Sequence, residues 1–156
     1  MNLLSLHRLD TAVCTAFNRI NHRRAWGRLF ARISRLGDGV IWYATMAILP
    51  LVFGLGELAL VGCLALNGLL CTALYTWLKG STQRPRPCEV HSHLLTTVAP
   101  LDRFSFPSGH TLHAVGFTVL IGAVHPLWCW WMVPFTVLVA LSRLVLGLHY
   151  PSDVLA

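Results

Sequence analysis

The stretch LALVGCLALNGLLCTALYTWL, from Leu58 to Leu78, contains no charged residue, and the basic sequence KGSTQRPRP, from Lys79 to Pro87, follows at once. A helix needs about 20 predominantly apolar residues to cross the hydrocarbon core of a bilayer. Inside lipid every backbone polar group must be paired within the segment, which leaves the helix as the only reasonable form. We therefore interpret residues 58–78 as a membrane-spanning helix with a basic sequence at its end.

Three other apolar segments have similar lengths, namely residues 40–56, 107–124 and 127–148. A tight turn around Gly54-Leu-Gly-Glu57 joins the first two spans into a helical hairpin, and His125-Pro126 turns the chain again. The chain is 55% hydrophobic and 12% charged, whereas a soluble domain carries roughly 25% charged residues. The sequence thus predicts an all-α, integral-membrane helical bundle of about four spans, with residues 79–106 as a polar loop.

Residues 1–39 are predicted to form a separate basic segment. Arginines interrupt its apolar residues at positions 19, 23, 24, 28, 32 and 35. Ala25, Leu29, Ile33 and Leu36 recur at steps of four and three, which is typical of an amphipathic helix lying in the membrane interface. A solvated basic helix packed on the domain is the alternative. The net charge of +6 favours anionic membrane lipids over nucleic acid as the partner in so apolar a chain.

Three short motifs stand in order at the ends of the predicted spans. They are K-x6-R-P from Lys79, P-S-G-H from Pro107, and S-R-x5-H-x3-D from Ser142. The predicted topology places all three at one membrane face. Their charged and titratable residues are Lys79, Arg86, Arg143, His110, His149 and Asp153. Three fixed cations, two histidines and one carboxylate are what the transfer of a phosphoryl group to a histidine requires.

Five of these motif residues are expected to bind phosphate. Arginine can hold two phosphate oxygens at once and lysine acts as a point charge, which suits Arg86, Arg143 and Lys79 to a clamp. Ser108 and Gly109 follow a proline at a predicted helix entrance, where free backbone amides bind anions and glycine lets the backbone approach closely. The Ser108 hydroxyl adds a donor.

Each motif also has a plainer interpretation. Lysine at the end of a span often only reaches the lipid headgroups with its charge. Ser108-Gly109 could be an ordinary loop end before a helix, and His149 with Asp153 a polar pair at a helix end. Arg143 favours the functional interpretation, because an unpaired charge inside an apolar segment is costly.

The three motifs together resemble the signature of the type 2 phosphatidic acid phosphatase superfamily, which vanadium haloperoxidases and glucose-6-phosphatase share. The resemblance covers residues 79–153. It implies that His149 is the nucleophile, that Asp153 orients it, and that His110 is the acid that protonates the leaving group. Water then hydrolyses the phosphohistidine. Residues 40–156 would be the phosphatase domain.

The resemblance and the membrane placement imply a lipid phosphate or diphosphate as the substrate, such as phosphatidic acid, phosphatidylglycerophosphate or a polyprenyl (di)phosphate. A lipid phosphotransferase and an inactive scaffold member are the alternatives. Members of the family normally continue past the aspartate with one more spanning helix, so we expect the domain to lack its last helix. No two of the six acidic residues are spaced to bridge two cations, and we expect neither a metal nor a cofactor.

The resemblance implies a bacterial inner membrane as the location. All 12 lysines and arginines fall on the motif side of the predicted topology, and the positive-inside rule assigns that side to the cytoplasm. Many bacterial members of the family work on the other side of the membrane. Both orientations of the site therefore stay open.

Overall fold

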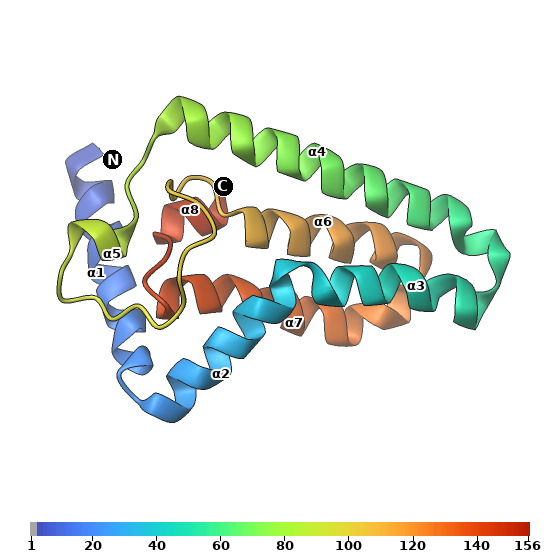
Figure 1. Cartoon of the computed structure of the whole chain (residues 1–156), viewed down its shortest axis with the longest axis horizontal. Coiled ribbons are helices and arrows are strands. Elements are labelled where there is room, and N and C mark those ends of the chain that lie inside the picture. The colour runs from blue at the N-terminus through green and yellow to red at the C-terminus, as the bar shows by residue number, and fades with distance from the viewer. Residues whose placement is uncertain (1–2) are drawn as a thin grey trace.

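The computed structural model describes residues 3–156, and this part of the chain contains helices and no β-strand. The helices in chain order are α1 (Leu3–Asn21), α2 (Arg24–Arg35), α3 (Ile41–Phe53), α4 (Leu58–Thr82), α5 (Pro87–Val90), α6 (Gly109–Val124), α7 (Cys129–Val145) and α8 (Pro151–Leu155). Figure 1 shows α3, α4, α6 and α7 running side by side as an elongated bundle, with α1, α5 and α8 gathered at one end. The prediction of an all-α membrane bundle is confirmed.

Three helical stretches are long and apolar enough to cross a membrane, namely Arg24–Phe53, Leu55–Val90 and Pro126–Val145, and α6 is a shorter apolar helix. Each of the four predicted spans therefore corresponds to a helix. At the start of the first span, α2 leads into α3 through the turn Leu36–Val40, in which Gly39 has a φ of 134°, outside the helical region. This positive φ suits glycine, and it forms a kink between the two helices.

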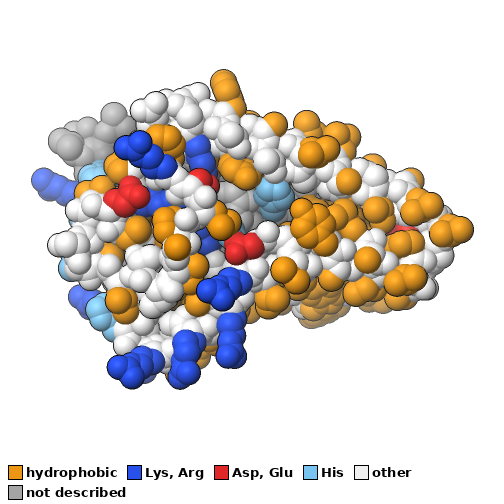
Figure 2. Space-filling view, in the orientation of Figure 1, with side chains coloured by type: hydrophobic (Ala, Val, Ile, Leu, Met, Phe, Trp, Pro, Cys, Tyr) orange, Lys and Arg blue, Asp and Glu red, His pale blue; other side chains and the backbone are white. Residues whose placement is uncertain are grey.

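The outer surfaces of the bundle are apolar, as the bilayer requires. In the most hydrophobic window of the stretch Leu55–Val90 only 11% of the residues are buried, and Leu69 and Trp77 on α4 are 70% and 67% exposed. Figure 2 shows hydrophobic side chains spread over the narrow part of the molecule and Lys and Arg side chains gathered at the opposite, broader end. The charged end is the end that carries the three motifs.

The core lies between α3, α6 and α7. Trp42 stacks obliquely against Phe117 with ring centroids 5.0 Å apart, and Met132 and Val139 of α7 are fully buried beside them. Close packing, not hydrophobic transfer, drives helix association in lipid, so small residues lie where backbones approach. Gly116 is such a residue, because an added Cβ would lie 2.7 Å from the side chain of Asn67 on α4.

The two N-terminal helices pack on the charged end of the bundle. On α2, Phe30 and Ile33 are buried and the helix lies against α7, as the packed-helix alternative requires. Trp26 and Leu29 of the same helix remain 48% and 45% exposed, which an interfacial helix also needs. On α1 the Asn18 amide donates to the carbonyl oxygens of Leu95 and Val145 at 2.8 and 2.9 Å, which anchors the helix to the motif loops.

Candidate active site

The C-terminus of α7 directs the third motif back onto its own helix. Gly147 adopts a left-handed φ of 68°, and the amide of Leu148 donates to the carbonyl of Arg143 at 3.0 Å. Together with the bond from Gly147 to Leu144, this is a Schellman ending, which leaves the helix at a sharp angle. Helix α7 therefore ends at Val145 and not at the predicted Leu148, and the turn brings His149 beside Arg143.

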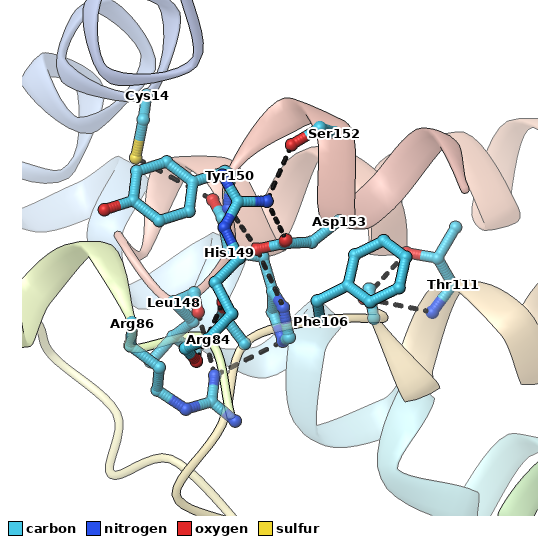
Figure 3. Close-up of polar contacts among 12 residues, drawn as sticks. Cys14, Arg84, Arg86, Phe106, Thr111, Leu148, His149, Tyr150, Ser152 and Asp153 are labelled. Carbon is cyan, nitrogen blue, oxygen red and sulfur yellow. Dashed lines mark hydrogen bonds and ion pairs between the residues drawn. The ribbon is translucent and has the colours of Figure 1, made fainter. Parts of the chain in front are cut away.

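The first motif continues from the end of α4 into an extended Arg-Pro-Arg-Pro stretch. Lys79 lies in the last turn of α4 and is 6% exposed, so the helix extends past the predicted end at Leu78. Proline forces the residue before it out of the helical region, and Arg86 has φ −77° and ψ 149°. In Figure 3, Arg84 and Arg86 approach the segment that carries His149 and Asp153.

The second motif forms the N-terminus of α6. The Ser108 hydroxyl accepts from the Oγ1 of Thr111 at 3.0 Å and from its amide at 3.5 Å, as an N-cap. Ser108 is 1% exposed, so its hydroxyl serves the helix end and not the cavity. An added Cβ at Gly109 would lie 3.0 Å from the Tyr75 ring, so the close approach of α4 to α6 depends on glycine here.

A cavity of about 690 Å³ lies between α3, α4, α6 and the turn after α7. Its polar end is lined by Lys79, Arg86, Gly109, His110, Arg143 and His149, together with Asp38 and Asp102. Its other wall is lined by side chains of the membrane helices, among them Met46, Leu64 and Leu69. Six of the eight predicted site residues thus meet around one cavity that is polar at one end and apolar at the other. Ser108 and Asp153 lie behind its wall.

Asp102 joins the cations of the first motif. Its carboxylate accepts from Lys79 Nζ at 2.6 Å and from Arg86 Nη2 at 2.7 Å. Burial raises the pKa of Asp102, but the hydrogen bonds and charges of the two cations outweigh it, and the net pKa lies below its usual value. The carboxylate is therefore ionised and neutralises part of the positive charge of the clamp.

Arg143 is buried in the last turn of α7, with 3% of its surface exposed. Its Nη1 donates to Ser34 Oγ at 2.5 Å and lies 3.4 Å from His110 Nε2. Its Nε is buried without a hydrogen-bond partner among the described residues. A buried guanidinium with an unpaired donor is costly. An anion in the cavity that accepted a hydrogen bond from Arg143 would remove this cost.

His149 is 1% exposed and turns its two ring nitrogens to opposite sides. Nε2 lies 3.3 Å from Arg86 Nη1, on the cavity side. Nδ1 lies 3.8 Å from Asp153 Oδ2 and makes no hydrogen bond with the described residues. Burial, and then the charges of Arg143, Arg86 and Lys79, hold the pKa of His149 well below its usual value. The imidazole is therefore neutral at pH 7, as a nucleophile must be.

Asp153 lies in the first turn of α8 and is fixed by the backbone around it. Its Oδ2 accepts from the Tyr150 amide at 2.8 Å, and its carbonyl accepts from the Ser108 amide at 2.8 Å. Burial raises the pKa of its carboxyl. The second bond joins the third motif to the second, so the two motifs cannot move independently.

His110 contacts the carboxylate of Asp38 through Nε2. Asp38 comes from the turn between α2 and α3, far from the motifs in the sequence. The His110 side chain is 10% exposed and lines the cavity. The site therefore holds two histidine–carboxylate pairs, His110 with Asp38 and His149 with Asp153.

Four charged residues around the site are not among the site residues that the sequence predicts: Asp10, Asp38, Arg84 and Asp102. Arg84 falls on a spacer position of the first motif, so the motif spacing does not single it out. The structure places it in ion pairs with Asp10 and Asp153. The repeat of Arg-Pro at residues 84–87 is the one local signal that could have drawn attention to it.

Comparison with known proteins identifies related sequences and folds. The sequence model of the PAP2 superfamily matches residues 56–156. A lipid A 1-phosphatase from Rhizobium johnstonii is 30% identical over 94 residues, which cover 58% of this chain and 37% of the relative. A decaprenylphosphoryl-5-phosphoribose phosphatase from Mycolicibacterium smegmatis is 37% identical over 81 residues, which cover 49% of this chain and 41% of the relative. The chain thus matches about two-fifths of the length of these relatives.

Two solved structures resemble the whole bundle. LpxE from Aquifex aeolicus superposes with a TM-score of 0.76 and 26% identity, covering 90% of this chain and 84% of the other. A transmembrane PAP2-type phosphatidylglycerolphosphate phosphatase from Bacillus subtilis superposes with a TM-score of 0.72 and 22% identity, covering 97% and 78%. The fold extends beyond the matched residues 56–156 to the N-terminal helices.

Proposed function

The chain belongs to the PAP2 superfamily, and from this membership we propose that it is a membrane phosphatase that hydrolyses a lipid phosphate or diphosphate through a phosphohistidine. The observation that carries the proposal is the convergence of Lys79, Arg86, Arg143, His110 and His149 on one cavity. A phosphate at the polar end would meet three cations, while the lipid chain would lie along the apolar wall. A bacterial inner membrane suits such a substrate.

In the proposed first step the neutral Nε2 of His149 attacks phosphorus and the bond from phosphorus to the lipid oxygen breaks. His110 gives its proton to that oxygen, which leaves as an alcohol. Asp153 faces Nδ1 at 3.8 Å and stabilises the positive charge that the ring gains. In the second step water attacks the phosphohistidine and gives a proton to His110, the nitrogen–phosphorus bond breaks, and inorganic phosphate leaves, so both histidines return to their starting states.

Charge stabilisation in this mechanism comes from the protein. Negative charge on the equatorial phosphate oxygens grows in the transition state, and Lys79, Arg86 and Arg143 would hold those oxygens. Gly109, at the N-terminus of α6, would add backbone amide donors. Ser108 supports this helix end through its hydroxyl. We propose that catalysis needs no metal ion.

The cavity and the relatives support the proposed substrate class. The two relatives are named for phosphatase activity on lipid A and on a decaprenyl phosphosugar. These names, together with the apolar cavity wall, support phosphate esters of long-chain lipids over free sugar phosphates. Phosphatidic acid, phosphatidylglycerophosphate, polyprenyl (di)phosphate and lipid A 1-phosphate form the test panel.

The test is phosphate release by the purified protein in detergent micelles that contain each lipid, with and without excess chelator. We expect release from at least one lipid, unchanged by chelator and inhibited by vanadate, which mimics five-coordinate phosphorus. His149→Ala is the inactive control. Loss of activity in chelator that magnesium restores would refute the metal-independent clamp, and release equal to that of His149→Ala on every lipid would refute the phosphatase.

A further inference from the structure

Arg84 lies outside the cavity lining but touches the carboxylate behind it. Its Nη1 donates to Asp153 Oδ1 at 2.5 Å and to Ser152 Oγ at 2.7 Å. Its Nη2 donates to Asp10 Oδ2 at 2.8 Å. Figure 3 shows the Arg84 guanidinium beside Ser152 and Asp153. One planar side chain thus joins α8 to α1, the N-terminal helix.

The contact divides the two oxygens of Asp153 between different partners. Oδ1 accepts from Arg84, and Oδ2 accepts from the Tyr150 amide and faces His149 Nδ1. A carboxylate held at both oxygens cannot rotate, so Oδ2 stays directed at the imidazole. The guanidinium is itself packed over the Tyr150 ring, 4.3 Å from its centroid, which fixes its plane.

Asp10 holds the other arm of Arg84. Its side chain is 5% exposed, and that of Asp153 is fully buried. Asp10 Oδ1 accepts from the Ser152 amide at 3.1 Å, and Oδ2 contacts the Ser152 hydroxyl. A buried carboxylate is retained only when it is paired, and Asp10 has its partners at the start of α8. Helix α1 thus takes part in fixing the segment that carries Asp153.

We propose that Arg84, held by Asp10 from α1, is a positioning residue that orients the Asp153 carboxylate toward His149. The proposal rests on the proposed phosphatase function. It assigns a role to a spacer position of the first motif and to a helix outside the matched residues 56–156. Arg84 touches no phosphate in this role, because it does not line the cavity.

Arg84 also favours the ionised form of Asp153. Burial raises the pKa of the Asp153 carboxyl above its usual value, while the hydrogen bond from the Tyr150 amide, the charge of Arg84 and hydrogen bonds from Ser105 and Arg84 lower it. The titratable and charged groups that act on Asp153 or face it are Arg84, Asp10, Cys14, His149 and Tyr150. Among these Arg84 is the fixed cation, so its removal should leave Asp153 protonated at a higher pH than in the wild type.

The experiment compares Arg84→Gln, Arg84→Lys and Asp10→Asn with Arg103→Gln. Arg103 is an exposed arginine of the same polar loop, so its substitution removes the same charge without touching Asp153. Each purified variant is assayed for kcat and KM over a range of pH on the lipid that the wild type hydrolyses best. Thermal unfolding in detergent reports whether the variants are folded.

We expect Arg84→Gln to lower kcat by about 100-fold, the loss typical of a misplaced catalytic group, with KM within about twofold of the wild type. The acid limb of its pH profile should move to higher pH. Arg84→Lys should recover part of kcat, and the acid limb of its pH profile should lie close to that of the wild type, because lysine keeps the charge. Asp10→Asn should lower kcat less than Arg84→Gln, and Arg103→Gln should match the wild type.

Two results would overturn the proposal: a kcat for Arg84→Gln equal to that of Arg103→Gln, or a reduced kcat with an unmoved acid limb in a variant that has lost thermal stability. The second result would mean that Arg84 only holds the fold together. An inactive wild type would instead contradict the proposed function, so the two failures are distinguishable.

Discussion

Nε2 of His110 contacts the carboxylate of Asp38 in the substrate-free protein. Nε2 is also the ring nitrogen that lies 3.4 Å from Arg143, on the side where a phosphate would bind. The atom that would protonate the leaving oxygen is therefore held by a residue of the turn between α2 and α3. This contact joins the turn between α2 and α3 to the end of the bundle that carries the three motifs.

Asp38→Asn should impair the acid step more than the attack step, because the ring of His110 loses the partner that fixes it. We expect kcat for a lipid phosphate to fall by about 10- to 100-fold, within the range of general acid catalysis. Hydrolysis of p-nitrophenyl phosphate, whose leaving group needs no proton, should fall much less. Equal losses on both substrates would argue against this role for Asp38.

Substitution of the two histidines should separate the two chemical steps. His149→Ala should remove about 10⁴-fold or more of kcat, as the loss of a nucleophile does, and no acid-labile phosphoenzyme should form. His110→Ala should lose about 10²- to 10⁴-fold on lipid phosphates and less on p-nitrophenyl phosphate. Radiolabelled phosphate trapped by rapid denaturation measures the phosphoenzyme, and label recovered on a residue other than His149 would contradict the assignment.

The pH dependence of stability should report the neutral state of His149. Burial and the nearby cations hold its pKa well below 6.5 in the folded protein, and unfolding restores the ordinary value. Below pH 6.5 the unfolded state then binds one more proton, so stability falls as the pH falls toward the folded-state pKa.

The slope of this loss should be about 1.4 kcal/mol per pH unit for one proton. Thermal unfolding in detergent between pH 7.5 and 5 measures this loss of stability as a fall in Tm. The fall should be smaller in His149→Gln. If Tm fell with pH equally in the wild type and in His149→Gln, protonation of the His149 ring would not be the cause of the lost stability.

Asp102 should weaken the binding of anions to the site, because it neutralises part of the charge of Lys79 and Arg86. Asp102→Asn removes one negative charge next to the clamp. We expect inorganic phosphate and vanadate to inhibit this variant more strongly, on the order of tenfold after screening at this half-exposed carboxylate. Product inhibition measures the effect. Glu89→Gln, which changes an exposed carboxylate of α5, is the control. Phosphate and vanadate should inhibit it as strongly as they inhibit the wild type.

The sequence predicts the bundle and most of the cavity lining, because both depend on local patterns. Apolar runs of fixed length place the four spans, and the spacing within each motif places Arg86, His110, Arg143 and His149. The C-terminus of α7 was placed three residues late, because Leu146 and Leu148 continue the apolar run while Gly147 has already ended the helix.

The partners of the motif residues could not be predicted in the same way. Asp38 meets His110 across 72 positions of the chain, and Asp10 meets Arg84 across 74. No periodicity or local spacing encodes such a contact, since it arises only when α1 and α2 pack on the end of the bundle. Lys79 was expected at a helix end and lies within the last turn, because Gly80-Ser-Thr82 continues the helix.

Because α1 is anchored on the motif loops, the segment that carries the motifs should not work when it is transferred to another protein without α1. A hybrid protein that joined residues 56–156 to the N-terminal helices of another protein would carry all three motifs unaltered. It would nevertheless lack the Asp10 carboxylate that holds Arg84 and the Asn18 amide that binds Leu95 and Val145. A hybrid should therefore be active only when the residues that make these contacts are transferred together with residues 56–156. The part of the protein that supports the site is larger than the three motifs.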